Sequence, residues 1–226
     1  LSLLNRNVVI FLTLILAVAS FNMISILLIL IMERTLVLAS TSPYRQELLK
    51  RLGLPFETAS PDIDESRKEE EEPEELVMRL SLEKAKAVAT DYPDALIIGS
   101  DQVATIDDEI IGKPGTHERA MEQLRAASGN DVVFLTGLAL YDTSSGRSHS
   151  ICEPFRVRFR QLTEQQIDDY LRREEPYDCA GSFKSEGLGI ALFSLMDGED
   201  PNALIGLPLI QLVSMLEENG IAVLGA

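Results

Sequence analysis

The sequence is poor in the side chains that build metal centres and redox sites. It has two cysteines, Cys152 and Cys179, two histidines, His117 and His149, and no tryptophan. No CxxC pattern is present, so a closed zinc site is disfavoured. We expect two reduced, mostly buried thiols. A Cys–His nucleophile pair stays open as an alternative, but no motif supports it.

Positive charge is also scarce. The 226 residues include 20 lysines and arginines against 36 aspartates and glutamates, which gives a formal net charge of −16. Such a surface repels phosphate backbones, so we expect no nucleic-acid partner. A small anionic ligand is still allowed if local cations and a bridging metal ion neutralise it. The chain length suits one domain with a substantial core.

One long hydrophobic run stands apart from the rest of the chain. Residues 8–32 are almost uninterrupted apolar sequence, long enough to span a bilayer as a helix. We therefore divide the chain into an apolar N-terminal extension, residues 1–31, and a globular domain, residues 32–226.

Three interpretations of the extension are open. We favour a mis-assigned start, because the chain begins with Leu1 and Met32 directly precedes the first expected strand. The alternatives are a membrane anchor and a signal peptide, since Ala17-Val18-Ala19 resembles a cleavage site although the apolar run continues past it. On the favoured interpretation the protein is cytoplasmic, and a membrane partner enters only if residues 8–32 are translated.

Strand and helix signals alternate after this run. Short apolar runs bounded by turn residues predict strands at 35–39, 54–59 and 95–99, a continuation at 103–106, and long strands at 131–141 and 150–159. Capping residues and apolar spacing predict helices at 42–53, 73–91, 116–127, 163–173 and 207–218. This interleaving predicts an α/β fold with a mixed sheet flanked by helices. The run Glu69–Glu72 is interpreted as a solvated loop.

The first candidate site lies where the first strand meets the first helix. Free backbone N–H groups and the helix dipole favour an anion at such a junction, and Ser42 adds a hydroxyl group. Arg45, in the first helical turn, is suited to bidentate contact with phosphate. The alternative is an ordinary capped helix with an exposed arginine.

A carboxylate follows the buried strand at 95–99. Asp101 is placed where open α/β sheets bind ligands, and it could hold a divalent cation or take a proton from water. One of Asp62, Asp64 and Glu65 could join it around Mg²⁺. The alternatives are a turn aspartate bonded to its own backbone and a solvated acidic loop.

Two lysines and a glycine-rich segment add candidates. Lys113 lies in the rigid Gly112-Lys113-Pro114 loop and could neutralise a phosphate, or simply occupy a surface turn. Lys84 falls on the apolar stripe of its helix, where it must either find a partner or snorkel. Residues 181–189 contain three glycines, which allow close backbone approach, and Glu186, which could accept hydrogen bonds from a guanine edge. Neither a P-loop nor a GxGxxG motif is present.

Together these segments resemble the Maf family of nucleotide pyrophosphatases. In the family's order, the matching segments are Leu38-Ala39-Ser40-Thr41-Ser42-Pro43-Tyr44-Arg45, Asp64-Glu65, Glu83-Lys84-Ala85, Gly99-Ser100-Asp101-Gln102-Val103, Gly112-Lys113-Pro114 and Ala180-Gly181-Ser182-Phe183-Lys184-Ser185-Glu186-Gly187. They span essentially the whole chain after Met32, and residues 1–31 have no counterpart. The resemblance is closest to the YceF-type branch, which prefers 7-methyl-GTP.

The resemblance implies an elongated mixed α/β fold of the Maf and ITPase-like kind, with a central cleft and often a dimer. It also implies an enzyme that converts 7-methyl-GTP to 7-methyl-GMP and pyrophosphate with a divalent metal cation, Mg²⁺ or Mn²⁺. The nucleoside triphosphate is then the substrate, and a homodimer is left open. The rival functions are a dTTP or UTP pyrophosphatase of another Maf branch and a non-catalytic nucleotide-binding regulator.

The resemblance also implies a role for each matching residue. The proton acceptor is Asp101, the residues that shape base specificity are Tyr44, Gln102 and Glu186, the phosphate ligands are Ser42, Arg45, Lys84 and Lys113, and the metal ligands are Asp101 and Glu65. The branch often has a tryptophan at the position of Tyr44. A tyrosine is physically suitable there, because an aromatic face attracts a purine made cationic by N7-methylation.

Overall fold

The computed structural model describes residues 34–107 and 109–225, and its helices and strands lie in one unit, Thr35–Ala226. The strands are β1 (Thr35–Ala39), β2 (Glu57–Ala59), β3 (Ala95–Ile106), β4 (Glu109–Ile111), β5 (Asp131–Asp142), β6 (Ser148–Phe159) and β7 (Phe193–Asp197). The α-helices are α2 (Pro43–Lys50), α3 (Pro73–Ala87), α4 (His117–Ala127), α5 (Glu164–Glu174), α6 (Pro201–Ile205) and α7 (Leu209–Glu218). Short 3₁₀ helices are η1 (Ala89–Asp91), η2 (Ala180–Ser182) and η3 (Leu188–Leu192).

The interpretations of the N-terminal region fall outside these ranges. The extension at residues 1–31 is not described, so the choice between a mis-assigned start, a membrane anchor and a signal peptide stays a prediction. Within residues 34–107 and 109–225, no helix combines the length and the hydropathy needed to cross a bilayer.

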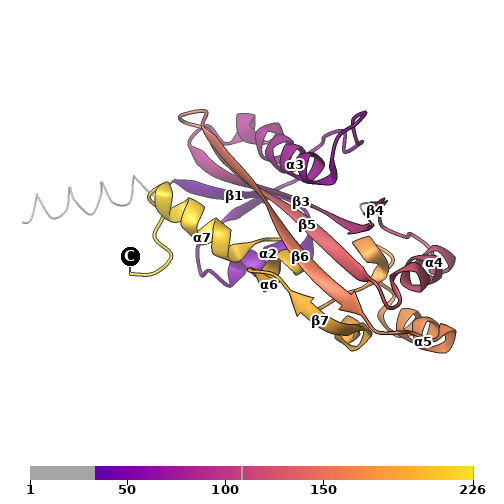
Figure 1. Ribbon diagram of the computed structural model, residues 1–226. Coiled ribbons are helices and arrows are strands. Elements are labelled where there is room, and N and C mark those ends of the chain that lie inside the picture. Colours follow the sequence, from indigo (N-terminus) through magenta and orange to yellow (C-terminus); the bar gives the residue numbers. More distant parts are fainter. Residues whose placement is uncertain (1–33, 108, 226) are drawn as a thin grey trace, which may run out of the picture. The chain divides into compact units, whose positions relative to one another are not determined.

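The described strands form one seven-stranded mixed sheet in the order β2–β1–β3–β5–β6–β7, with β4 paired to the end of β3 (Figure 1). β2, β1 and the first part of β3 are parallel, whereas the other pairings are antiparallel. β1 pairs with β3 as far as Ile98, and β4 pairs with it from Ala104 onward. Among the described strands, β3 therefore has no partner on that side between these two residues, which leaves a gap in the sheet.

The predicted α/β class is confirmed, with one correction that concerns Asp101. The sequence places Asp101 after the end of a strand, but it lies in the middle of β3, because β5 continues to pair with β3 from Leu96 to Thr105. It still lies beyond the carboxyl end of parallel strand β1, where α/β sheets bind ligands. β4, β7 and α6 are missed by the sequence, because these short elements lack the continuous apolar run that marks β1.

Helices cover both faces of the sheet (Figure 1). α3 covers one face, and α2, α6 and α7 lie on the other, while α4 and α5 lie together beyond the end of β5 and β6. Apolar residues explain the arrangement: Leu48 of α2 and Leu212 of α7 are buried in the same cluster as Leu96 and Ile98 of β3. Because neighbouring residues of a strand face opposite ways, Ile97 joins a different cluster on the α3 face.

Two glycines let α3 approach the sheet closely. A Cβ atom on Gly99 of β3 would lie 1.9 Å from the Ser81 carbonyl oxygen, and one on Gly137 of β5 would lie 2.2 Å from that of Val77. A strand glycine often marks such a backbone approach. The contact matters for the site, since Lys84 follows Ser81 by one helical turn and Asp101 follows Gly99 on the same face of β3.

Gly99→Ala should destabilise the fold by about 1–3 kcal/mol, the usual cost of overpacking, because α3 must move away from β3. Urea unfolding of both proteins would measure the change. Gly112→Ala is the control, since nothing lies within 4 Å of a Cβ atom at that position. Equal stability of the two variants would show that α3 can retreat without cost.

Candidate active site

A cavity of about 750 Å³ lies at the gap in the sheet, and its lining includes the end of β1, the middle of β3 and part of β4. It brings together all of the site residues that the sequence and the resemblance select: Ser42, Tyr44, Arg45, Glu65, Lys84, Asp101, Gln102, Lys113 and Glu186. Of the three acidic-loop candidates, Glu65 lines the cavity, while Asp62 and Asp64 are absent from its described lining. These side chains come from six separate segments of the chain.

A buried lysine links two of the candidate carboxylates. Lys84 is 6% exposed, and its Nζ lies 2.6 Å from Asp101 Oδ1 and 2.8 Å from Glu65 Oε1. Asp101 is also buried, at 8% exposed, whereas the Glu65 side chain remains 60% exposed. Of the two alternatives for an inward-facing lysine, the structure therefore shows a paired ammonium group rather than a snorkelling one.

The pairing with Lys84 leaves Asp101 a second oxygen. Oδ1 accepts the hydrogen bond from Lys84, and Oδ2 has no hydrogen bond from the described residues. The carboxylate is thus held in one orientation with an oxygen available as a hydrogen-bond acceptor. A group in this arrangement can take a proton from water or bind a cation.

The same carboxylates offer oxygen donors to a metal ion. The two oxygens that share Lys84 are close together, and carboxylate oxygens are the hard ligands that Mg²⁺ prefers. No group of three or more His, Cys, Asp or Glu side chains suited to a metal occurs among residues 34–107 and 109–225. The set fits an ion whose other ligands are phosphate oxygens and water, as is usual for Mg²⁺.

α2 presents its N-terminal residues to the cavity. Ser42 is the N-cap, and its Oγ accepts a hydrogen bond from Arg45 N at 3.4 Å, with Pro43 in the first helical turn. The Arg45 Nε donates to the Gly206 carbonyl oxygen at 2.8 Å, which leaves Nη1 and Nη2 for a ligand. Burial lowers the pKa of the Arg45 guanidinium, and the negative charges of Asp101 and Glu65 oppose this. Arginine stays charged at neutral pH after such a shift.

Three cations act on one carboxylate at this end of the cavity. The hydrogen bond from Lys84 lowers the pKa of Glu65, and the charges of Lys84, Lys113 and Arg45 lower it further, against the opposing effect of partial burial. Lys113 is exposed and makes no ion pair with any described residue. These cations come from α2, α3 and the loop after β4, so the positive charge is gathered from distant parts of an acidic chain.

A second group of side chains lies around Tyr44. Partial burial raises the pKa of Tyr44, the charges of Cys179 and Asp178 raise it further, and the nearby Lys184 has the opposite effect. The hydroxyl group therefore stays neutral at physiological pH. Glu186 is exposed and lies in the same glycine-rich segment as Lys184. The arrangement offers an aromatic face and a carboxylate, which suit a cationic aromatic ligand.

Gln102 is held by contacts that the sequence does not reveal. Its Nε2 donates to Thr136 Oγ1 at 2.9 Å and to the carbonyl oxygens of Ala203 at 2.8 Å and Leu204 at 3.2 Å. These acceptors fix the orientation of the amide, because only the nitrogen can donate to them. The amide oxygen has no hydrogen bond from the described residues, so Gln102 can offer an acceptor to a ligand.

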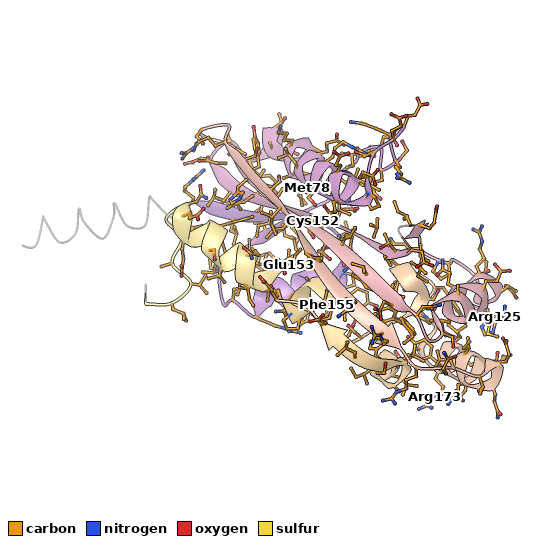
Figure 2. All side chains as sticks on the ribbon, in the orientation of Figure 1. Met78, Arg125, Cys152, Glu153, Phe155 and Arg173 are labelled. Atoms are coloured by element: carbon orange, nitrogen blue, oxygen red, sulfur yellow. The ribbon has the colours of Figure 1, made fainter. Side chains whose placement is uncertain are left out.

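The thiols and imidazoles do not form a nucleophilic pair. Burial raises the pKa of Cys152 and of Cys179 to about 12, so both thiols are protonated at neutral pH and unreactive. Cys152 lies on β6 (Figure 2). It is absent from the cavity lining, whereas Cys179 belongs to it. His117 contacts Tyr177 and Asp168 instead of a cysteine. The Cys–His alternative is therefore wrong for these residues.

The acidic loop before α3 is more ordered than its composition suggests. The prediction that Glu69–Glu72 is solvated is wrong for Glu71, which is 8% exposed and binds Arg79 through both oxygens, at 2.5 and 2.8 Å. Arg79 also donates to the Ser66 carbonyl oxygen at 3.0 Å. The hydrogen bonds from Arg79 hold the pKa of Glu71 down at about 2. This ion pair fixes the loop that carries Glu65.

Comparison with known proteins agrees with the resemblance found in the sequence. Residues 35–219 match the family model described as Maf-like protein. The chain is 63% identical over 190 residues to a 7-methyl-GTP pyrophosphatase of Nitrosococcus oceani, a match that covers 84% of this chain and 96% of that protein. It is 60% identical over 188 residues to the 7-methyl-GTP pyrophosphatase of Pseudomonas aeruginosa, covering 83% of this chain and 98% of the relative.

Solved structures were also compared. The chain aligns with the Ham1 protein of Staphylococcus aureus at a TM-score of 0.49 and 13% identity, over 82% of this chain and all of that one. A HAM1 protein from Coxiella burnetii aligns at a TM-score of 0.48 and 16% identity, over 82% and 99% of the two chains.

The Glu71–Arg79 pair predicts how stability responds to acid. Because the pKa of Glu71 is lowered on folding, its stabilising effect is complete above its ordinary value of 4.5 and is lost as the pH falls toward 2. Glu71→Gln should therefore lower the free energy of unfolding at pH 7, and the gap to the wild type should narrow below pH 4.5. Urea titrations from pH 7 to 2.5 would measure it, with Glu69→Gln as an exposed control. A gap independent of pH would contradict the assignment.

Proposed function

Because this chain belongs to the Maf family, we propose that it hydrolyses 7-methyl-GTP to 7-methyl-GMP and pyrophosphate. The observation that carries the proposal is the convergence of the predicted site residues, scattered from Ser42 to Glu186, on one cavity. Support also comes from two relatives named for this activity, which align with the chain over nearly their whole length.

Asp101 is proposed as the proton acceptor. Its Oδ1 is held by Lys84, so Oδ2 is the oxygen that receives a proton from water as the water oxygen attacks phosphorus. The anhydride bond between the α- and β-phosphates then breaks, and pyrophosphate leaves. Lys84 acts through Asp101, because its ammonium group donates a hydrogen bond to Oδ1 and fixes the orientation of the carboxylate.

The cations are proposed to stabilise charge on the phosphates. Arg45 has two free Nη groups and Lys113 a free ammonium group, and both are placed near the carboxylate pair. Ser42 adds the start of α2, where the helix dipole favours an anion. Fixed positive groups of this kind stabilise charge as it develops on the leaving pyrophosphate.

Asp101 and Glu65 are the proposed ligands of a divalent cation, either Mg²⁺ or Mn²⁺. When bound, such an ion supplies charge neutralisation to the phosphate oxygens. The protein contributes two carboxylates already drawn together by Lys84, so little rearrangement is needed to present them.

Base recognition is proposed for the side chains at the other end of the cavity. The neutral Tyr44 ring attracts a purine that N7-methylation has made cationic. The free amide oxygen of Gln102 can accept from a guanine N–H group, and Glu186 offers both an acceptor and a complementary negative charge. An uncharged pyrimidine would gain none of the charge complementarity.

A nucleotide panel tests the substrate. Pyrophosphate release with Mg²⁺ should be fastest with 7-methyl-GTP, and Glu186→Gln should reduce the kcat/KM ratio of 7-methyl-GTP to GTP by roughly threefold or more. Glu175→Gln, which removes an exposed acid outside the cavity lining, is the control. A preference for dTTP or UTP would point to another Maf branch, binding without turnover would indicate a regulator, and an unchanged ratio would remove Glu186 from recognition.

Asp101→Asn tests the proton acceptor. The amide keeps the shape of the side chain but cannot act as a base, so kcat should fall by about 10²- to 10⁴-fold. Circular dichroism would check that the variant is folded. Asp169→Asn is the matched control, because Asp169 is absent from the cavity lining and pairs with Arg173, which Figure 2 labels on α5. Turnover close to that of the wild type would exclude Asp101 from the mechanism.

A further inference from the structure

One cation lines the cavity without having been selected from the sequence. Arg67 lies in the acidic loop before α3, two residues after Glu65. Its Nε donates to the Glu71 carbonyl oxygen at 2.6 Å. Nη1 and Nη2 make no hydrogen bond with the described residues, so they are the donors that Arg67 can offer to the cavity.

Among the described residues, Arg67 lacks the carboxylate partner that several other arginines have. Arg79, Arg125 and Arg158 each bind a carboxylate through two nitrogens. Arg67 is surrounded in sequence by glutamates, yet among the described residues it makes no ion pair. Its positive charge is therefore available to an anion that enters the cavity.

Hydrogen bonds and an ion pair hold Arg67 and the loop around it in place. The Glu71 carbonyl oxygen holds its Nε, while the Glu71 carboxylate binds Arg79 and accepts a hydrogen bond from Lys68 N at 3.0 Å. Arg79 lies on α3, the helix that also positions Lys84. A guanidinium anchored in this way loses less freedom when it binds an anion than an unrestrained surface arginine would.

We propose that Arg67 binds the pyrophosphate part of the substrate and of the product. This proposal rests on the proposed function and adds a residue to it. The other cations are partly engaged, since Lys84 is paired with two carboxylates and the Nε of Arg45 is bound to Gly206. Arg67 lines the same cavity two residues after Glu65, on which the charges of Lys84, Lys113 and Arg45 act, whereas Tyr44 interacts with Cys179 and Lys184.

Binding of pyrophosphate itself provides the test. Calorimetric titration of the full chain with pyrophosphate and Mg²⁺ would compare the wild type with Arg67→Ala, Arg67→Lys and Lys68→Ala. Arg67→Ala should weaken binding by roughly tenfold, and Arg67→Lys should recover part of the loss, because a lysine keeps the charge without the two-pronged geometry.

Lys68→Ala is the matched control, since it removes the same charge from the next residue, which is exposed and does not line the cavity. It should bind pyrophosphate within about twofold of the wild type, as expected for an exposed charge. Affinity for 7-methyl-GMP should be unchanged in Arg67→Ala, which distinguishes a pyrophosphate contact from general damage to the cavity.

Wild-type affinity of Arg67→Ala for pyrophosphate would overturn the proposal. An equal loss in Lys68→Ala would also overturn it, because the effect would then be a general one of loop charge. The titration does not depend on turnover. A wild type that binds pyrophosphate but hydrolyses no nucleotide would refute the proposed function and leave the role of Arg67 intact.

Discussion

The site depends on a lysine held between two carboxylates. Burying an ammonium group or a carboxylate alone is costly, and the cost is recovered only when opposite charges meet at close range. Lys84 and Asp101 meet at 2.6 Å because Gly99 and Gly137 let α3 lie directly on the sheet. A packing feature of the backbone thus determines the orientation of the proposed base.

The chain and its proposed ligand are both negatively charged. The fold counters this repulsion by gathering positive side chains in the cavity. Several of its arginines, such as Arg125 and Arg158, are paired with carboxylates at the surface, whereas the cavity collects Arg45, Arg67, Lys84 and Lys113 from four segments. At long range an acidic surface repels anions, but salt screens this effect over about 10 Å. Short-range contacts in the cavity are screened much less, so they can dominate binding.

Sequence patterns recovered the elements that are long or well capped and the residues that belong to a recognisable motif. The capping box at Thr163 and the proline at the start of α2 form as expected. Contacts that join remote segments were not predictable from spacing. The hydrogen bond from Gln102 to Ala203 links residues 101 positions apart. The burial of Glu71 depends on its ion pair with Arg79, so composition alone made the run Glu69–Glu72 look solvated. Arg67 was overlooked because its place in the cavity lining cannot be predicted from spacing along the chain.

Asp101 and Gln102 are consecutive in β3 and therefore face opposite sides of the sheet, yet both border the cavity because the sheet is interrupted there. One side chain meets α3 and the other meets α6. The alternation of a single strand thus places the proposed proton acceptor in one layer and the proposed base-recognition residue in the other. A one-residue insertion or deletion upstream in β3 would exchange the two assignments at once, so evolution can retune this enzyme by replacing side chains but not by sliding the strand.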